Sequence, residues 1–343
     1  MLRSLICLVL IATFGIRAAE PPVPPADDGH GWKLISGELI QKLLQDGKKI
    51  GYPGQTTGLA VDRTTGELYL VVPDQGVWKS TDHGQTFARV DGGAITGRCE
   101  TGYTINTDPN GKRLAFFMLD GKCAMTLDAG ATWLPLTSVG RNWDFAAVDW
   151  AADKPQAIFA ALHESGGQLM ASADAGKTWT KLDKDLKYTA VGVIDATTFL
   201  TTRGEGILRS TDAGKTWTKV SDLQPVGRLM QNFAGTAWWV GKDAMLISRD
   251  KGVTWEKWGA PLEACGWGPW FGKDEKQVMV AGKKGFIETT DAGQTWRPAV
   301  SLPAINGFDA SRTGWFLNLA WDPRSDTFYA CKMGAGAYRY ERR

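Results

Sequence analysis

An aspartate with fixed neighbours recurs six times along the chain, and a carboxylate could take part in acid–base chemistry. It is the third residue of an octapeptide that reads Ser or Thr, any residue, Asp, any residue, Gly, any residue, Thr, and Trp or Phe. A catalyst needs one site, whereas this acid repeats in every unit. We therefore predict that the octapeptide is a rigid turn, in which Asp accepts backbone hydrogen bonds, Gly adopts a positive φ and the last ring packs between strands. The six acids are Asp82, Asp128, Asp174, Asp212, Asp250 and Asp291.

The elements that carry these turns are short strands. The aspartates lie 38 to 46 residues apart, which is the length of one four-stranded propeller blade. In the fourth unit, strands A to D are predicted at residues 188–194, 198–202, 206–210 and 216–220, with the octapeptide spanning the turn from C to D. Residues 38–45 have apolar side chains at helical spacing and predict one short helix.

The two ends of the chain each carry part of a further blade. Residues 319–322, 327–331 and 336–340 predict strands A, B and C without a following octapeptide, and residues 31–35 look like a D strand with nothing before it. Joining them closes the ring and removes exposed sheet edges. The sequence therefore predicts an all-β fold: a single seven-bladed β-propeller over residues 31–343, with four antiparallel strands per blade.

The octapeptide STDAGKTW at residues 210–217 resembles the Asp-box, or BNR repeat. That repeat occurs in sialidases, in propeller glycoside hydrolases that cut xyloglucan, in sortilin-type receptors and in an assembly factor of photosystem II. The resemblance implies the propeller fold. It does not select a function, because these families include enzymes and non-enzymes.

The catalytic motifs of these enzymes are not intact in this chain. The Phe/Tyr-Arg-Ile-Pro motif of sialidases has only IGYP at residues 50–53 as a counterpart. The xyloglucan-cleaving family has a catalytic Asp in a stretch similar to YACKMGAGAYRY at residues 329–340, where this chain has Met333. The equivalent stretch of the first blade, residues 69–78, keeps an acid, Asp74, one position out of register.

Function is expected on the face opposite the octapeptides, where the loops from strand B to C meet the connectors from D to the next A. These segments mix charged and aromatic residues, which suits sugar stacking or a protein interface. The connectors carry Arg98, Glu100, Arg141 and Asp144 among others. The predicted ligand-binding residues are Asp120, His163, Arg203, Trp143, Trp267, Trp270, Trp315 and Lys332. Two alternatives stay open: Trp267 and Trp270 could plug the central channel, and His163 could be a solvated loop residue.

Two functions from different classes fit these residues. The first is an exported, non-catalytic binding propeller that recognises a polysaccharide or a protein partner on this face. The second is a glycoside hydrolase with Asp74 and Glu164 as the catalytic pair and Asp120 as the next candidate. Hydrolysis requires two carboxyl groups about 5 to 5.5 Å apart for retention, or roughly 6.5 to 9.5 Å for inversion.

The N-terminus predicts export. Residues 1–19 contain Arg3, an apolar stretch at 5–16 and small residues at Ala18 and Ala19, which is typical of a signal peptide. Residues 20–30 form a Pro-rich linker, and no transmembrane segment is predicted in the mature chain. Lys and Arg number 39 against 37 Asp and Glu, and removing Arg3 and Arg17 equalises them. This balance argues against nucleic acid or an anionic membrane as a partner, and we expect a monomer.

The cysteines agree with an oxidising compartment. Cys99, Cys123, Cys265 and Cys331 remain after cleavage, and we predict disulfides between Cys99 and Cys123 and between Cys265 and Cys331. These cysteines have no CxxC spacing and the three histidines are scattered, so no metal site is predicted. No cofactor is expected.

Overall fold

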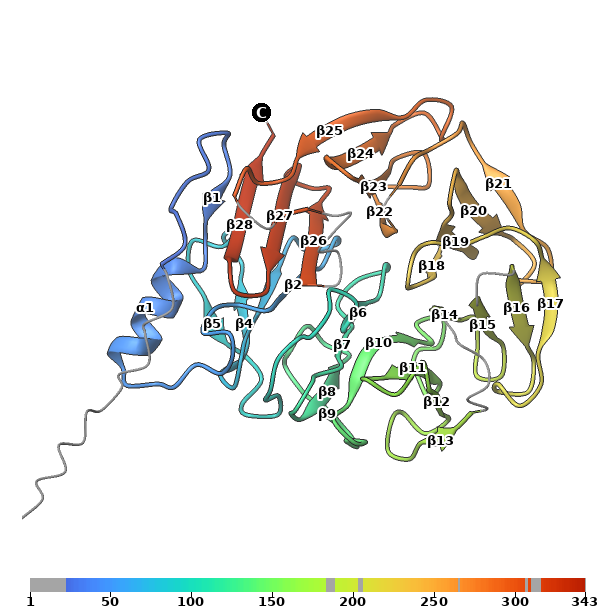
Figure 1. The fold of residues 1–343 in the computed structure, drawn as a ribbon, viewed down its shortest axis with the longest axis horizontal. Coiled ribbons are helices and arrows are strands. Elements are labelled where there is room, and N and C mark those ends of the chain that lie inside the picture. Colours follow the sequence, from blue (N-terminus) through green and yellow to red (C-terminus); the bar gives the residue numbers. More distant parts are fainter. Residues whose placement is uncertain are drawn as a thin grey trace, which may run out of the picture.

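The computed structural model describes residues 23–182, 189–202, 206–264, 266–305, 308–309 and 316–342. Seven antiparallel sheets of four strands each are arranged in a ring, which is the predicted seven-bladed β-propeller (Figure 1). Within each blade, strands A to D run outward from the central axis. One helix, α1 (Gly37–Gln45), is present in this part of the chain.

The first three blades follow one another along the chain. Blade 1 contains β2 (Gly58–Val61), β3 (Leu68–Val72), β4 (Gly76–Ser80) and β5 (Ala88–Arg89). Blade 2 contains β6 (Ile105–Thr107), β7 (Leu114–Phe116), β8 (Cys123–Thr126) and β9 (Leu134–Leu136). Blade 3 contains β10 (Trp143–Val148), β11 (Ile158–Leu162), β12 (Leu169–Ser172) and β13 (Thr180–Lys181).

The next three blades repeat this order. Blade 4 contains β14 (Ala190–Val193), β15 (Phe199–Thr202), β16 (Ile207–Ser210) and β17 (Thr218–Ser221). Blade 5 contains β18 (Gln231–Phe233), β19 (Thr236–Val240), β20 (Met245–Ser248) and β21 (Glu256–Trp258). Blade 6 contains β22 (Trp267–Phe271), β23 (Val278–Gly282), β24 (Gly285–Thr289) and β25 (Arg297–Ser301).

Blade 7 is built from both ends of the chain, as predicted. It contains β26 (Leu317–Asp322), β27 (Thr327–Lys332), β28 (Gly336–Glu341) and the N-terminal β1 (Lys33–Leu34). In its outer pair, Lys33 lies opposite Arg339 and Leu34 opposite Tyr338. Part of the predicted linker also contacts this blade, because the Tyr338 hydroxyl donates to the Pro25 carbonyl at 2.9 Å.

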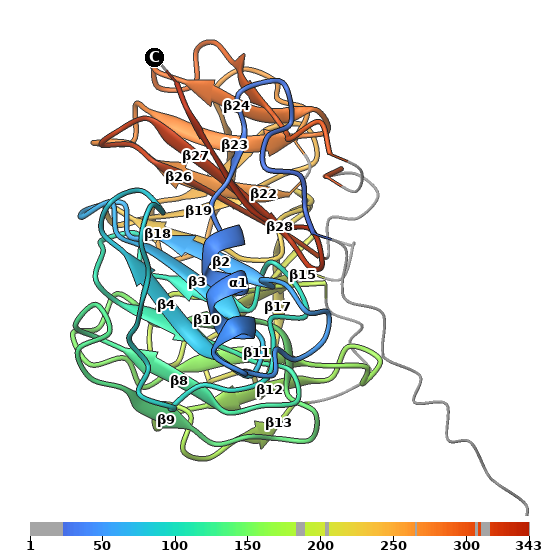
Figure 2. The same cartoon turned by 90° about the vertical axis from the view of Figure 1, so that its left-hand side faces the viewer.

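The hydrophobic core lies within and between the blades. Strands A to C are largely buried, whereas outer strands such as β5 and β13 are short and exposed. Short outer strands offer little edge for pairing with another chain. Helix α1 lies outside blade 1, where Leu39, Ile40 and Leu43 pack against Val72 (Figures 1 and 2). No helix in the described part of the chain is long and apolar enough to cross a bilayer.

The six octapeptides share one hydrogen-bonding pattern, illustrated by blade 4. Asp212 Oδ1 accepts the Ser210 hydroxyl at 2.7 Å and the Thr216 N–H at 2.9 Å, while Oδ2 accepts the Thr216 hydroxyl at 2.6 Å. The Gly214 N–H donates to Ser210 Oγ at 2.8 Å. The equivalent bonds are present in the other five copies. These bonds are local, so the acid stabilises the turn.

Two further features of the octapeptide were not predicted. The residue before the glycine also has a positive φ in every copy, 59° at Ala213 for example. In four copies its N–H bonds to the turn between strands A and B, as from Ala213 to the Thr197 carbonyl at 2.9 Å. The octapeptides and the A–B turns therefore share one face. The closing ring reaches the preceding blade, because Trp179 Nε1 donates to the Thr137 carbonyl at 3.0 Å.

Candidate functional site

Backbone pairing on the opposite face joins segments of three blades. The Arg98 N–H donates to the Leu119 carbonyl at 3.1 Å, and the Leu119 N–H donates back at 2.8 Å. Leu119 also forms a bridge with Asn142, and the His163 N–H donates to the Asn142 carbonyl at 2.7 Å. The connector into blade 2, the B–C loop of blade 2, the connector into blade 3 and the B–C loop of blade 3 therefore lie side by side. This pairing fixes the backbone positions from which their side chains extend.

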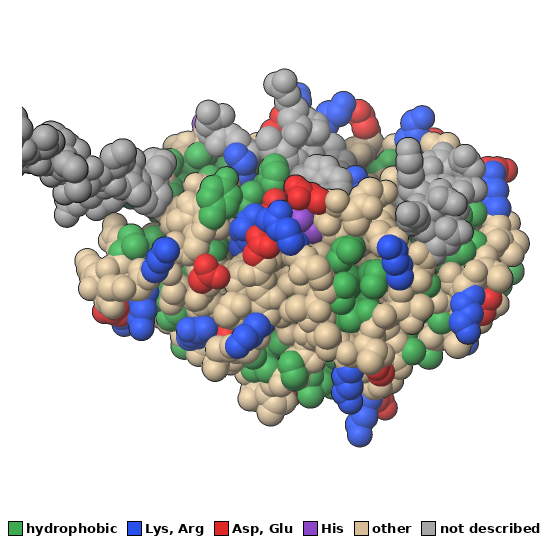
Figure 3. Space-filling model, turned by 60° about the horizontal axis from the view of Figure 1, so that its bottom comes forward, with side chains coloured by type: hydrophobic (Ala, Val, Ile, Leu, Met, Phe, Trp, Pro, Cys, Tyr) green, Lys and Arg blue, Asp and Glu red, His purple; other side chains and the backbone are tan. Residues whose placement is uncertain are grey.

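Seven side chains from these segments form a continuous set of ion pairs, called here the charged network. Arg98 contacts Glu100 at 2.9 Å and Asp120 at 3.6 Å. Arg141 contacts the other side of Asp120 at 2.8 Å and Glu164 at 3.3 Å. His163 lies 3.6 Å from Glu164 and 2.6 Å from Asp144. A patch of acidic, basic and histidine side chains is visible in Figure 3.

The pair of Asp120 and Arg141 at the centre of the network is ionised, and the network is partly open to solvent. Hydrogen bonds from Arg141 lower the pKa of Asp120, and the same contact raises the pKa of Arg141. The side chains of Glu164, Arg141 and Asp120 are 70%, 55% and 42% exposed, whereas that of His163 is 10% exposed. Surface ion pairs contribute at most about 1 kcal/mol each to stability. The network is therefore better suited to presenting charge than to holding the fold together.

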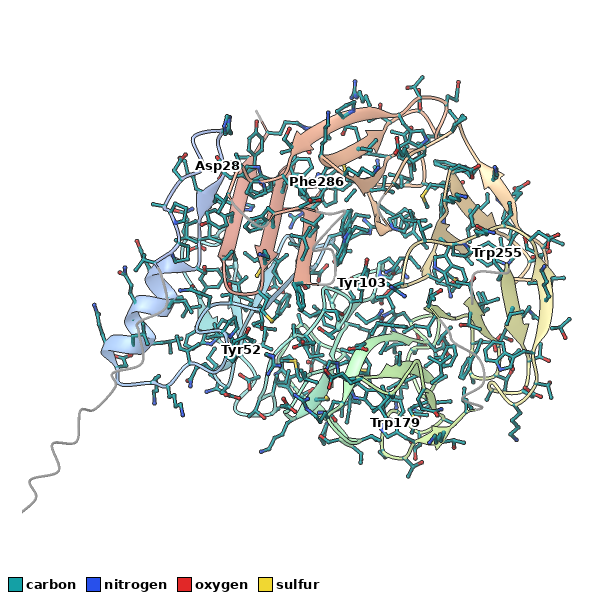
Figure 4. All side chains as sticks on the ribbon, in the orientation of Figure 1. Asp28, Tyr52, Tyr103, Trp179, Trp255 and Phe286 are labelled. Atoms are coloured by element: carbon teal, nitrogen blue, oxygen red, sulfur yellow. The ribbon has the colours of Figure 1, made fainter. Side chains whose placement is uncertain are left out.

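An exposed aromatic ring lies at one end of the network. Tyr52 is 70% exposed, and the Arg98 guanidinium stands 5.3 Å from the centre of its ring. Figure 4 shows Tyr52 near blade 1, away from the axis where Tyr103 lies. IGYP at residues 50–53 matches an enzyme motif only poorly, and Tyr52 was not among the predicted binding residues. A Tyr next to Pro in a long connector on the binding face was the available signal.

The predicted acids do not all meet. Asp120, His163 and Glu164 come together in the network, which places His163 among acids instead of in open solvent. Asp74 is held elsewhere, because its Oδ1 accepts the Gly97 N–H at 3.0 Å and its own N–H donates to the Gly97 carbonyl at 3.1 Å. Among the described residues it forms no ion pair with the network. The proposed catalytic pair of Asp74 and Glu164 therefore does not share a partner.

Two of the predicted ligand-binding tryptophans are inside the protein. Trp143 has 0% of its surface exposed and packs edge-on against Phe117. Trp267 is 3% exposed and stacks on Tyr103 with ring centres 4.1 Å apart. Strand residues that point between blades or toward the axis are covered by their neighbours, so neither indole presents a face to a ligand. The alternative role for Trp267, as a plug in the channel, matches this geometry.

The remaining predicted binding residues stand as follows. Trp270 is half-buried beside Phe286, with ring centres 5.6 Å apart, and Lys332 is half-buried at the end of β27. Arg203 and Trp315 lie outside the described residues.

A cavity near the axis is smaller than a usual ligand pocket. It measures about 100 Å³ and is lined by residues that include Tyr103 and Trp267. Ligand pockets usually measure roughly 300 to 1,000 Å³. On the octapeptide side, Arg63 crosses the opening, with Nε donating to the Pro109 carbonyl at 2.5 Å and Nη1 to the Gly272 carbonyl at 3.0 Å. Burial of this guanidinium lowers its pKa.

The cysteines differ from the predicted pairing. Cys99, Cys123 and Cys331 are free, buried thiols, so the structure does not contain the Cys99–Cys123 disulfide. Cys99 Sγ packs against Gly58 of blade 1, whereas Cys123 Sγ accepts the Met118 N–H at 3.1 Å in blade 2. Cys265 lies outside the described residues, but Cys331 is a free thiol, so the predicted Cys265–Cys331 disulfide is wrong as well. No group of residues suited to hold a metal occurs in the part of the chain that the structure describes.

Comparisons with known proteins give structural likenesses only. No protein-family model matches the chain, and no curated protein sequence matches it. The structure of YCF48 from Cyanidioschyzon merolae is 13% identical, with 91% of this chain and 99% of that chain covered and a TM-score of 0.47. YCF48 bound to D1 peptide is also 13% identical, with 84% and 94% covered and a TM-score of 0.47.

An enzyme is also among the similar structures. The GH74 xyloglucanase from Xanthomonas campestris is 16% identical, with 84% of this chain and 55% of that chain covered and a TM-score of 0.32. Likenesses this distant carry no argument about substrate or partner. The function has to be argued from the residues of this chain.

Proposed function

We propose that this protein is an exported, non-catalytic propeller of the Asp-box type that binds a polysaccharide or a protein partner on the face carrying the charged network. The observation that carries this proposal is the network itself. It joins exposed charged side chains of blades 2 and 3 to the exposed ring of Tyr52, on the face without octapeptides. Tyr and Arg are among the residue types that carry most of the energy of binding interfaces.

The same contacts argue against acid catalysis. A glycosidase acid must keep its proton at working pH, which requires a raised pKa. The pKa of Asp120 is lowered by Arg141, so this carboxyl is ionised. Glu164 contacts Arg141 at 3.3 Å, and its side chain is 70% exposed, so the second carboxyl is not enclosed in a site. These surroundings support binding over hydrolysis.

Binding can be tested on a glycan array and on an array of peptides, with the mature protein and two variants. Arg141→Ala breaks the centre of the network, and Tyr52→Ala removes the exposed ring. A matched control is Arg249→Ala, because Arg249 is 51% exposed and pairs with Glu256 at 2.6 Å in blade 5. We expect both network variants, and not the control, to lose at least tenfold in affinity for the best probe. Equal affinity in all four proteins would refute the proposal.

A glycoside hydrolase remains the second candidate because of one observation. Asp120 and Glu164 contact the same guanidinium, so their separation does not exceed the roughly 9.5 Å of inverting carboxyl pairs. Product release from plant and bacterial polysaccharides tests this candidate. Product release that is lost in Glu164→Gln would favour hydrolysis. If Asp74→Asn also loses product release, the result would support Asp74 and Glu164 as the catalytic pair predicted from the sequence.

Export is part of the proposal and rests on residues 1–19, which lie outside the described residues. Expression of the full chain in a bacterial host, followed by N-terminal sequencing of the periplasmic fraction, tests it. We expect a new N-terminus after Ala18 or Ala19. A full-length protein that stays in the cytoplasmic fraction would contradict export.

A further inference from the structure

The position of His163 between two carboxylates gives the network a feature that simple ion pairs lack. Its Nδ1 lies 2.6 Å from Asp144 Oδ1, and its Nε2 lies 3.6 Å from Glu164 Oε1. A protonated imidazole has two N–H donors and a positive charge, and it attracts both acids. A neutral ring has one N–H donor, and its other nitrogen is an acceptor. The shorter contact assigns that single proton to the side of Asp144, which leaves an acceptor facing Glu164.

Glu164 in turn covers part of Arg141. Asp120 occupies two nitrogens of this guanidinium, with Nε to Oδ1 at 2.9 Å and Nη2 to Oδ2 at 2.8 Å. The remaining nitrogen, Nη1, lies 3.3 Å from Glu164 Oε2. The carboxylate of Glu164 therefore sits between two cationic groups when His163 is protonated, and beside one when it is neutral.

The other charges around this group are constant in the relevant pH range. His163 and Glu164 directly contact Asp144 in β10 and Arg141 in the connector into blade 3. The charged groups beyond these are Asp120, Arg98 and Glu100 along the network, and Arg228, which interacts electrostatically with Asp144. Ordinary carboxylates and guanidiniums do not change charge between about pH 5.5 and 8.5, whereas histidine does.

We propose that His163 and Glu164 form a proton-controlled cover over Arg141. When His163 loses its proton, Glu164 is held less tightly, and Nη1 of Arg141 becomes available to a carboxylate on the partner. A carboxylate suits this position because it can replace the one that leaves. The inference about the partner rests on the proposed binding function, whereas the movement of the cover does not depend on it.

The size of the effect follows from the exposure of Glu164. Its side chain is 70% exposed, so the contact with His163 is that of a surface ion pair and not of a buried one. A contact of this kind changes an equilibrium by at most about fivefold. We therefore expect a threefold to fivefold change in the availability of Arg141 across the titration.

Labelling with p-hydroxyphenylglyoxal, a reagent for exposed arginines, measures this availability without any partner. Adducts at Arg141 and Arg249 are quantified by peptide mapping at pH 5.5 and 8.5. Arg249 is an internal standard for the intrinsic pH dependence of the reagent, because its exposure is similar and its partner Glu256 contacts no histidine among the described residues. We expect the ratio of Arg141 to Arg249 labelling to rise threefold to fivefold from pH 5.5 to 8.5.

Two variants make the test specific. In Glu164→Gln the ratio should be high at both pH values, because the charged cover is gone. In His163→Gln it should no longer depend on pH. Unchanged circular dichroism spectra control for folding.

A flat ratio in the parent protein would overturn the proposal, and so would a persistent rise in either variant. Because no partner is present, failure of the cover is distinct from failure of the binding function, which the array experiments test.

Discussion

Closure of the ring by the N-terminal segment can be tested at Trp32. This residue precedes β1 and is 1% exposed, although it lies some three hundred residues from its partners. Its indole Nε1 donates to the Ser301 carbonyl of blade 6 at 2.9 Å, and its ring centre lies 5.7 Å from that of Tyr340. The side chain therefore holds the N-terminal strand to both blade 7 and its neighbour.

Replacement by alanine should be costly. Truncation of a buried Trp to Ala typically lowers the free energy of unfolding by about 3 to 5 kcal/mol, because apolar contacts are lost and a cavity remains. Trp32→Phe keeps most of the ring and loses one hydrogen bond. Because Ser301 is exposed, water can bind its freed carbonyl, so we expect a loss of about 1 to 2 kcal/mol.

Urea denaturation monitored by circular dichroism measures both losses. The control is Leu44→Ala, since Leu44 in α1 is 51% exposed and its truncation should change the free energy of unfolding by less than about 0.5 kcal/mol. A loss below about 1 kcal/mol in Trp32→Ala would refute the reasoning. It would mean that the blade can be closed without this anchor.

Three further predictions concern the turns and the C-terminus. Hydrogen bonds from Thr178 lower the folded-state pKa of Asp174 from 3.8 to about 2, so its stabilising contribution is present above about pH 4 and is lost as the pH falls toward 2. Acid titration of unfolding should therefore show that Asp174→Asn is less stable than the parent at pH 6 and closer to it at pH 2. Ala213→Gly should stabilise the protein by up to about 1 kcal/mol in thermal unfolding, because Ala213 has a φ of 59°, and Ala88→Gly in strand β5 should instead destabilise it. Arg342→Ala should cost about 1 to 3 kcal/mol in urea denaturation, because Glu288, whose side chain is 3% exposed, loses a bidentate partner at 2.8 and 2.9 Å; an unchanged midpoint would contradict this role.

The architecture could be predicted because it depends on repeated local patterns. The octapeptide marks the same turn six times, and the two incomplete ends could be recognised by comparison with complete units. The pairing of Lys33 with Arg339 confirms that step. The same reasoning could not predict that Ala213, as well as the following glycine, has a positive φ, because the sequence does not distinguish such an alanine from any other.

The binding face could be predicted only in part because its side chains lie on irregular segments. Loop order alone predicts that Asp120, His163 and Glu164 share one face, and the structure brings these three side chains into one set of ion pairs. Their ion pairs depend on the pairing of Leu119 with Arg98 and Asn142, which follows no periodicity. The solvent exposure of the predicted binding residues was the least reliable prediction. A tryptophan near the start of an inner strand can point to the axis or to solvent, and Trp267 points to the axis.

The difference between the two faces supports the location of the site. On the octapeptide face, Asp, Ser, Thr and Gly groups bond to one another within each of the six turns, as Asp212 does with Ser210 and Thr216. On the opposite face, the charged network is confined to blades 2 and 3, and its members come from four different segments. The other blades form the same four-stranded sheets without this network. Its restriction to two neighbouring blades therefore supports the proposal that this face binds a partner.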